Sequence, residues 1–328
     1  MSIIKNEIRN CAKDKWNYVP LSEPIPITKQ VWPKGTIPLV CIRTMTFMHE
    51  NYVDDCISGI LMQKTTFPVR VCIHDDASKD KTAELVRKYQ AKYPNLIWAY
   101  FQNENSYRHP NRKAMRSKFW EFFKVGKYFA LCEGDDYWTD PLKLQKQVEF
   151  LEENKDIAGV GCYYHIINQF GNDAVFQKLD NEPRFIRFKW DDYLKGGAPG
   201  IRTLTMVYRS DAVNRVNEKI SFSPKLRSAG DVLLVSSILK SEGDLCLLPF
   251  FGAIYRKHDK GLSAGLKIKS KKRKQHFYNY EGIMRLVLSS KKEKIFFWYR
   301  NFKNTIKGDI AYFRIGQVIK DALLIFEK

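Results

Sequence analysis

The segment VRVCIHDDASKDKTAELVRKY, residues 69–89, carries the pattern that decides the fold. Its first six residues form a short apolar run, which is typical of a strand buried on both faces. After a polar stretch, Leu85 and Val86 fall on one side of a predicted helix, with Ser78 or Asp80 as its N-cap. The segment therefore predicts a strand, a loop and a helix, which together make one unit of a parallel sheet.

The same alternation continues on both sides of this segment. Apolar runs at 37–43, 96–101 and 127–132 predict three further strands, and helical patterns occupy 53–61 and 119–123. Strands that alternate with helices form a parallel sheet with right-handed crossovers. We therefore predict an α/β fold with a mostly parallel central sheet flanked by helices, and ligands at the carboxyl ends of its strands.

Four regions are expected along the chain. Residues 1–35 are polar and interrupted by prolines, so we interpret them as a surface extension. Residues 36–150 carry the strand–helix alternation, and residues 151–265 form the second half of the same domain. Residues 266–328 contain 16 Lys and Arg against 5 Asp and Glu, and we expect a basic, aromatic-rich helical tail there. In the second half we expect strands at 159–167 and 203–208 and helices at 190–194 and 231–239.

Composition limits the classes of protein that remain. With 328 residues and 44% hydrophobic residues the chain can build a sizeable core, so wholesale disorder is excluded. The net charge of +19 implies an anionic partner. We expect no membrane-spanning helix, because no apolar run of about 18 residues occurs, and no secretory signal. The seven cysteines form no C-x-x-C pair; reduced thiols in a cytoplasmic protein are expected, and a structural zinc site is not.

Three carboxylates follow the fourth predicted strand within four residues: Glu133, Asp135 and Asp136. Like charges this close repel one another unless a cation neutralises them. Oxygen ligands suit Mg²⁺ or Mn²⁺, which often hold substrate phosphates in such a setting. A helix start with Thr139 or Asp140 as N-cap and Pro141 at its first position is the alternative, and it explains Asp140 but not the three preceding carboxylates.

A second acidic pair, Asp75 and Asp76, follows the strand at 69–74. Acidic residues in this position contact the base or ribose in nucleotide sites. Asp also favours helix N-termini, so capping of the following helix remains open.

Five pieces of the chain occur in an order that resembles the family 2 glycosyltransferases of the GT-A fold, and among them the bacterial members with an EGDDYW block. The resemblance covers roughly residues 37–265. It rests on IRTMTFMHENY at 42–52, IHDDASKDKT at 73–82, EGDDYWTDPLKLQKQV at 133–148, AGDVLL at 229–234 and YRKH at 255–258. Two departures are Met48, where the family usually has a polar residue, and Glu133, where many members have Asp.

The resemblance implies a Rossmann-like GT-A domain, a nucleotide-sugar donor, a divalent metal and inversion at the transferred sugar. Residues 36–150 would bind the nucleotide-sugar and residues 151–265 the acceptor. Asp76 would contact the base, and Asp135 with Asp136 would form a D-x-D-like element, with Asp136 as the direct metal ligand. The expected donor-binding residues are Thr44, Thr46, Glu50, Asp75, Asp76, Asp135, Arg256 and His258. The expected ligands of Mn²⁺ or Mg²⁺ are Asp136, Asp135 and His258.

The general base implied by the resemblance is Asp231. Inverting sugar transfer needs one base for the acceptor hydroxyl and positive charge on the departing diphosphate. Taken alone, Asp231 also fits an N-cap of the helix at 231–239. Asp191 and Asp192 are rival bases in a segment that also reads as a plain helix start.

The combined prediction is a metal-dependent inverting glycosyltransferase that uses a nucleoside-diphosphate sugar, with UDP favoured. The resemblance implies a saccharide or lipid-linked saccharide acceptor in cell-surface polysaccharide or lipopolysaccharide synthesis. The basic tail at 266–328 suits either a peripheral contact with the anionic inner face of the cytoplasmic membrane or a helical appendage packed on the domain. No nucleic-acid motif occurs, so nucleic acid is not an expected partner. The alternatives are a sugar nucleotidyltransferase on a related fold and a non-catalytic protein that binds polyanions or membrane surfaces.

Overall fold

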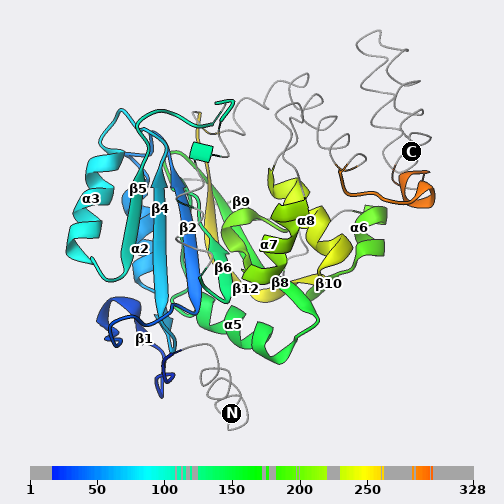
Figure 1. Cartoon of the computed structure of the whole chain (residues 1–328), viewed down its shortest axis with the longest axis horizontal. Coiled ribbons are helices and arrows are strands. Elements are labelled where there is room, and N and C mark those ends of the chain that lie inside the picture. The colour runs from blue at the N-terminus through cyan, green and yellow to red at the C-terminus, as the bar shows by residue number, and fades with distance from the viewer. Residues whose placement is uncertain are drawn as a thin grey trace. The chain divides into compact units, whose positions relative to one another are not determined.

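The fold is described from a computed structural model of the chain (Figure 1). Calpha contacts divide the chain into two units, and the first comprises residues 1–186, 200–214 and 245–256. The second unit comprises residues 187–199, 215–244 and 257–328. The residues that the structure describes are 17–107, 109–111, 114–115, 119, 125–171, 175–176, 182–196, 198, 200–219, 230–259, 261, 283, 286–295 and 297.

Strands and helices alternate through the first half of the described chain, as the sequence predicts. The strands are β1 Ile25–Pro26, β2 Val40–Thr46, β3 Lys64–Thr65, β4 Val69–Asp75, β5 Ile97–Phe101, β6 Tyr128–Leu131, β7 Tyr137–Trp138, β8 Ile157–Asn168, β9 Val175–Phe176, β10 Ile186–Phe188, β11 Val207–Arg209 and β12 Asp244–Lys257. The α-helices are α2 Val53–Leu61, α3 Thr82–Lys92, α5 Lys143–Glu153, α6 Trp190–Gly196, α7 Ser210–Lys219 and α8 Gly230–Ser241.

The parallel part of the sheet is built around β2. Strand β2 pairs in parallel with β4 on one side and with β6 on the other, and β4 pairs in parallel with β5. Figure 1 shows β2, β4 and β5 side by side in this order. The chain therefore runs outward from β2 to β5 and then returns to the opposite side of β2 with β6. Such a reversal of strand order opens a crevice at the carboxyl ends of the two strands, where open α/β sheets bind ligands.

Antiparallel strands extend the sheet beyond β6. Strand β11 pairs antiparallel with both β6 and β8, and β7 pairs antiparallel with β12. The order in the first unit is β12-β8-β11-β6-β2-β4-β5, with β7 on β12 and β9 on β8. The mixed α/β sheet confirms the predicted fold class, a Rossmann-like GT-A arrangement.

The core combines side chains from the apolar runs that predicted the parallel strands with side chains from helices α2 and α5. In β2 and β4 the side chains of Val40, Ile42, Val71 and Ile73 are fully buried. Burying each such side chain contributes about 1.5–3 kcal/mol. Six cysteines of the described chain are buried and free of disulfides, as expected for reduced thiols.

Several predicted boundaries differ from the structure for local reasons. The strand expected at 203–208 begins only at Val207, because Thr203–Thr205 form a 3-10 helix. Helix α5 begins at Lys143, after Asp140 and Pro141. The Asp140 carboxylate accepts the N–H of Leu142 at 2.8 Å, and the Pro141 carbonyl accepts the N–H of Lys64 at 2.7 Å. These bonds hold a turn ahead of the helix.

Some predictions fall largely outside the described residues. They are the helix at 119–123, the extension before residue 17 and most of the basic tail at 266–328. In the described part of the chain, no helix combines the length and apolar character needed to cross a membrane.

Candidate functional site

The loops that follow β2 and β6 approach each other closely at Gly134. A Cβ atom on this glycine would lie 2.7 Å from Cγ2 of Thr46 and 2.8 Å from Nδ1 of His49, closer than side chains normally pack. The N–H of Gly134 donates to the Met45 carbonyl at 3.0 Å. Glycine is therefore required where the acidic block passes β2, and the approach brings the acidic block next to His49.

Hydrogen bonds to the start of α3 hold the loop that carries His49. The N–H groups of Met48 and His49 donate to the hydroxyl oxygens of Ser78 and Thr82 at 3.0 and 2.8 Å. The Asp80 carboxylate accepts the N–H of Glu50 at 3.2 Å. Ser78 and Asp80, predicted as alternative caps of the helix, thus both bind the neighbouring loop. Asp80 also accepts the N–H of Thr82, the first residue of α3, at 3.0 Å.

The bonds to Asp80 also affect its ionisation. Partial burial works against the charged form, but hydrogen bonds from Thr82 and Glu50 outweigh it and lower the pKa of the Asp80 carboxyl below its ordinary value. The Asp80 carboxylate therefore stays ionised, and holds the N–H of Glu50, to a lower pH than an ordinary aspartate would.

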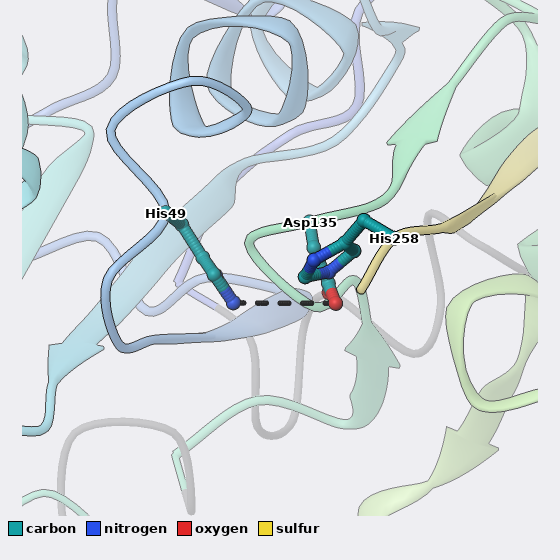
Figure 2. A group of neighbouring side chains, drawn as sticks. All are labelled: His49, Asp135 and His258. Atoms are coloured by element: carbon teal, nitrogen blue, oxygen red, sulfur yellow. Dashed lines mark ion pairs between the residues drawn. The ribbon is translucent and has the colours of Figure 1, made fainter. Parts of the chain in front are cut away.

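Three side chains from separate segments lie together at this edge of the sheet: His49, Asp135 and His258 (Figure 2). Each offers one ligand atom, and these atoms lie within 4.8 Å of one another. The Nε2 atom of His49 lies 4.0 Å from Oδ2 of Asp135. His258 follows the last residue of β12 directly in the chain. Two imidazoles and one carboxylate form a donor set that first-row divalent ions accept, so the group fits a metal ion after small side-chain adjustments.

Asp136 is buried and is not part of this group. Its side chain is 3% exposed, and its Oδ1 atom accepts the backbone N–H of Arg256 at 2.9 Å. Burial raises the pKa of the Asp136 carboxyl well above its ordinary value, and the neighbouring Asp135 and Glu133 carboxylates raise it further. Of the three expected metal ligands, Asp135 and His258 belong to the group and Asp136 does not.

The third carboxylate of the acidic block, that of Glu133, forms an ion pair with an arginine. Arg43 of β2 places Nη2 3.4 Å from Oε1 of Glu133, and both side chains are partly exposed. The block thus divides into three environments: Glu133 pairs with an arginine, Asp135 joins two histidines, and Asp136 is buried.

A backbone carbonyl, a carboxylate and two aromatic rings contact the Arg256 guanidinium. Its Nε atom donates to the Asp135 carbonyl at 3.2 Å, and its Nη2 atom donates to Oδ2 of Asp55 at 2.5 Å. The guanidinium carbon also lies over the rings of Tyr52 and Tyr137, at 4.9 and 5.3 Å from their centroids.

The acidic pair after β4 organises two loops. Asp75 accepts the Thr46 hydroxyl at 2.9 Å and both the N–H and the hydroxyl of Ser78. Asp76 is 4% exposed, and its Oδ1 atom accepts the N–H and the hydroxyl of Ser106 at 2.9 and 2.6 Å. Both residues therefore lie at the carboxyl edge of β4, as predicted, and tie it to the end of β2 and to the loop after β5.

The remaining predicted residues have different settings. Thr44 is fully buried within β2, and Glu50 accepts the N–H of Lys81 at 3.1 Å. In the second unit, Asp231 is the exposed second residue of α8, and its Oδ1 atom accepts the N–H of Val232. Its rivals Asp191 and Asp192 are exposed near the start of α6.

Sequence reasoning missed His49 as a member of the group. It lies inside the quoted segment 42–52, but a single histidine is more often structural than a ligand. The signal that identifies it is spatial, because 86 residues separate it from Asp135 and only the adjacent pairing of β2 and β6 brings them together.

Comparison with known proteins agrees with this architecture. A model of glycosyl transferase family 2 matches residues 41–216, which is more than half of the chain. The chain belongs to this family.

Relatives and solved structures extend the comparison. An uncharacterized protein of Mycobacterium tuberculosis is 31% identical over 229 residues, which is 67% of this chain and 59% of the relative. The uncharacterized glycosyltransferase EpsJ of Bacillus subtilis is 24% identical over 245 residues, 69% of this chain and 63% of EpsJ. The chain thus spans less than two thirds of the length of either relative.

Two solved structures share the fold. TarS 1-349 of S. aureus, in complex with UDP-GlcNAc, has a TM-score of 0.57 at 17% identity, covering 80% of this chain and 72% of TarS. The mannosyltransferase PcManGT of Pyrobaculum calidifontis, in complex with GDP-Man and Mn²⁺, also has a TM-score of 0.57, at 13% identity, covering 97% of this chain and 81% of PcManGT.

Proposed function

We propose that this protein transfers a sugar from a nucleoside-diphosphate donor to a saccharide or lipid-linked saccharide, with a divalent metal ion bound by His49, Asp135 and His258. The observation that carries the proposal is the convergence of these three side chains where the strand order reverses between β2 and β6. The family of the chain supports the same reaction class.

The donor set favours a transition-metal ion such as Mn²⁺ over Mg²⁺. Two of the three donor atoms are imidazole nitrogens, whereas Mg²⁺ prefers oxygen ligands throughout. When bound, the ion would supply positive charge that stabilises the departing diphosphate. This proposal differs from the set expected from the sequence, which was Asp136, Asp135 and His258: Asp135 rather than Asp136 is the direct carboxylate ligand, and His49 is added.

The donor nucleotide would lie at the carboxyl ends of β2 and β4. Asp76 remains the proposed contact to the base, and the loops fixed by Asp75 and Thr46 would shape the edge of that site. UDP is our favoured nucleotide, and the UDP-GlcNAc complex of TarS supports that choice for this fold.

Asp231 remains the proposed general base, with inversion at the transferred sugar. Its exposed carboxylate is available to take the proton of an acceptor hydroxyl, a role that typically contributes about 10²–10⁴-fold to the rate. Asp191 and Asp192 are the rival candidates, and both are also exposed.

The proposal for the acceptor rests on the positive charge of residues 266–328. Residues 266–328 contribute 16 Lys and Arg against 5 Asp and Glu, and such a segment is attracted to anionic lipid surfaces. A peripheral location at the inner face of the cytoplasmic membrane, where lipid-linked saccharides for surface polysaccharides are built, follows from this proposal. Equal cosedimentation of the protein with anionic and neutral vesicles would contradict it.

A thermal-unfolding panel tests the proposed donor directly. The protein is heated with UDP, GDP, CDP and their common sugar derivatives, with Mn²⁺ and with EDTA. A ligand that binds the folded form raises the midpoint temperature of unfolding. At a ligand concentration 100 times the dissociation constant, the added stability is about 2.7 kcal/mol. We expect uridine ligands with Mn²⁺ to give the largest shift. No shift with any nucleotide would contradict a nucleotide-sugar transferase.

A further inference from the structure

Arg256, near the end of β12, contacts the segments that carry all three members of the metal group. Its Nε atom donates to the Asp135 carbonyl at 3.2 Å, and His258 follows it two residues later in the chain. Its guanidinium carbon lies 4.9 Å from the ring of Tyr52, whose centroid is 6.4 Å from that of the His49 imidazole. A movement of this guanidinium would therefore disturb the segments that hold each of the three ligands.

Helix α2 supplies the group that fixes the guanidinium. Oδ2 of Asp55 lies 2.5 Å from Nη2 of Arg256, in an ion pair whose arginine is 8% exposed. The Tyr137 ring packs on the guanidinium at 5.3 Å and Tyr52 at 4.9 Å, so the plane of the group is held as well. Charge-assisted bonds from the rigid arginine fork are strong and directional, and lysine cannot reproduce them.

We propose that Asp55 and Arg256 form a positioning pair that sets the spacing of His49, Asp135 and His258 for the metal ion. The inference rests on the proposed function, because it assigns a role at the same metal site. Groups that orient metal ligands without touching the ion typically change metal affinity by 10–100-fold when removed. This role is additional to the donor-binding role expected for Arg256 from the sequence, and it rests on the bonds that Nε and Nη2 donate to the Asp135 carbonyl and the Asp55 carboxylate.

Direct binding of Mn²⁺ to the full chain, without nucleotide, tests the inference. The free ion gives a six-line electron paramagnetic resonance signal that is lost on binding, so titration yields the dissociation constant. We compare Asp55→Asn and Arg256→Lys with wild type. Asp54→Asn is the matched control, because it removes the same charge from the adjacent exposed position of α2. Asp55→Glu restores the carboxylate, and thermal unfolding without metal reports on folding.

We expect Asp55→Asn and Arg256→Lys to weaken Mn²⁺ binding by about 10-fold or more. Asp54→Asn should bind like wild type, and Asp55→Glu should recover part of the affinity. The inference is overturned if Asp55→Asn and Asp54→Asn bind Mn²⁺ equally well. If Asp55→Asn fails to fold, wild-type affinity in Arg256→Lys overturns it instead. Wild-type protein that binds no Mn²⁺ would remove the proposed metal site itself, which is a distinguishable result.

Discussion

At the scale of single residues, the acidic block shows how neighbouring carboxylates acquire different roles. Asp135 and Asp136 are adjacent, yet one joins two histidines and the other is buried against the N–H of Arg256. The density of carboxylates after β6 predicted an acidic site from sequence alone. Which carboxylate faces the histidines depends on the direction of each side chain, which the local sequence does not encode.

Gly134 gives the prediction that belongs to this scale. The variant Gly134→Ala would place a methyl group 2.8 Å from Nδ1 of His49 and 2.7 Å from Cγ2 of Thr46, so these side chains must shift. Because such a shift displaces a ligand, we expect Mn²⁺ affinity to fall by about 10-fold or more. Titration of Mn²⁺ in the absence of nucleotide measures the change.

The matched control for Gly134 is Gly230→Ala, where an added Cβ atom would meet nothing within 4 Å. We expect this variant to keep wild-type affinity for Mn²⁺. Equal affinity in Gly134→Ala and wild type would mean that the approach of the two loops does not position His49.

At the scale of elements, α5 carries a charge in the core. Lys143, its first residue, is fully buried, donates from Nζ to Gln147 at 2.8 Å, and lies 4.1 Å from the centroid of the Trp138 ring. Burial lowers the pKa of the Lys143 ammonium from 10.5 to about 8, against smaller opposing effects of nearby Cys162, Cys132 and Asp140.

This shift predicts a pH dependence of stability. Below about pH 8 the ammonium is charged in both states, and its burial destabilises the folded state. Between pH 8 and 10.5 the folded chain loses the proton that the unfolded chain still holds, so the free energy of unfolding rises with pH. At 1.36 kcal/mol per unit, the rise amounts to about 3 kcal/mol.

The variant Lys143→Met lacks this rise, and denaturant unfolding across pH 8 to 10.5 measures it. The excess stability of wild type over the variant should grow by about 3 kcal/mol over that range. Lys146→Met, which removes a more exposed ammonium of the same helix, keeps Lys143 and should retain the rise. Parallel pH profiles for wild type and Lys143→Met would refute the explanation.

The elements themselves were largely predictable, because uninterrupted apolar runs mark the buried strands. The predicted run at 69–74 became β4 Val69–Asp75, and the helix predicted at 231–239 became α8 Gly230–Ser241. Boundaries differed where polar side chains bind distant backbone. Ser78 binds the loop after β2, so α3 begins later than its capping pattern suggested.

At the scale of the whole molecule, the site depends on contacts between residues far apart in sequence. The strand order around β2 places the loops after β2 and β6 side by side, and this order follows from the pairing of whole strands. Sequence patterns predict that ligands gather at the carboxyl ends, and family resemblance named Asp135 and His258. Neither identified His49, whose role depends on the folded arrangement.

The most direct test of the central claim is the affinity for UDP, measured by calorimetry with Mn²⁺ and with EDTA, in wild type and in Asp135→Asn. If the cation held by His49, Asp135 and His258 bridges the protein to the donor diphosphate, Mn²⁺ should strengthen UDP binding to wild type by about 10-fold or more. The same addition should give little gain in Asp135→Asn, which loses the carboxylate ligand. Equal gains in both proteins would contradict the account.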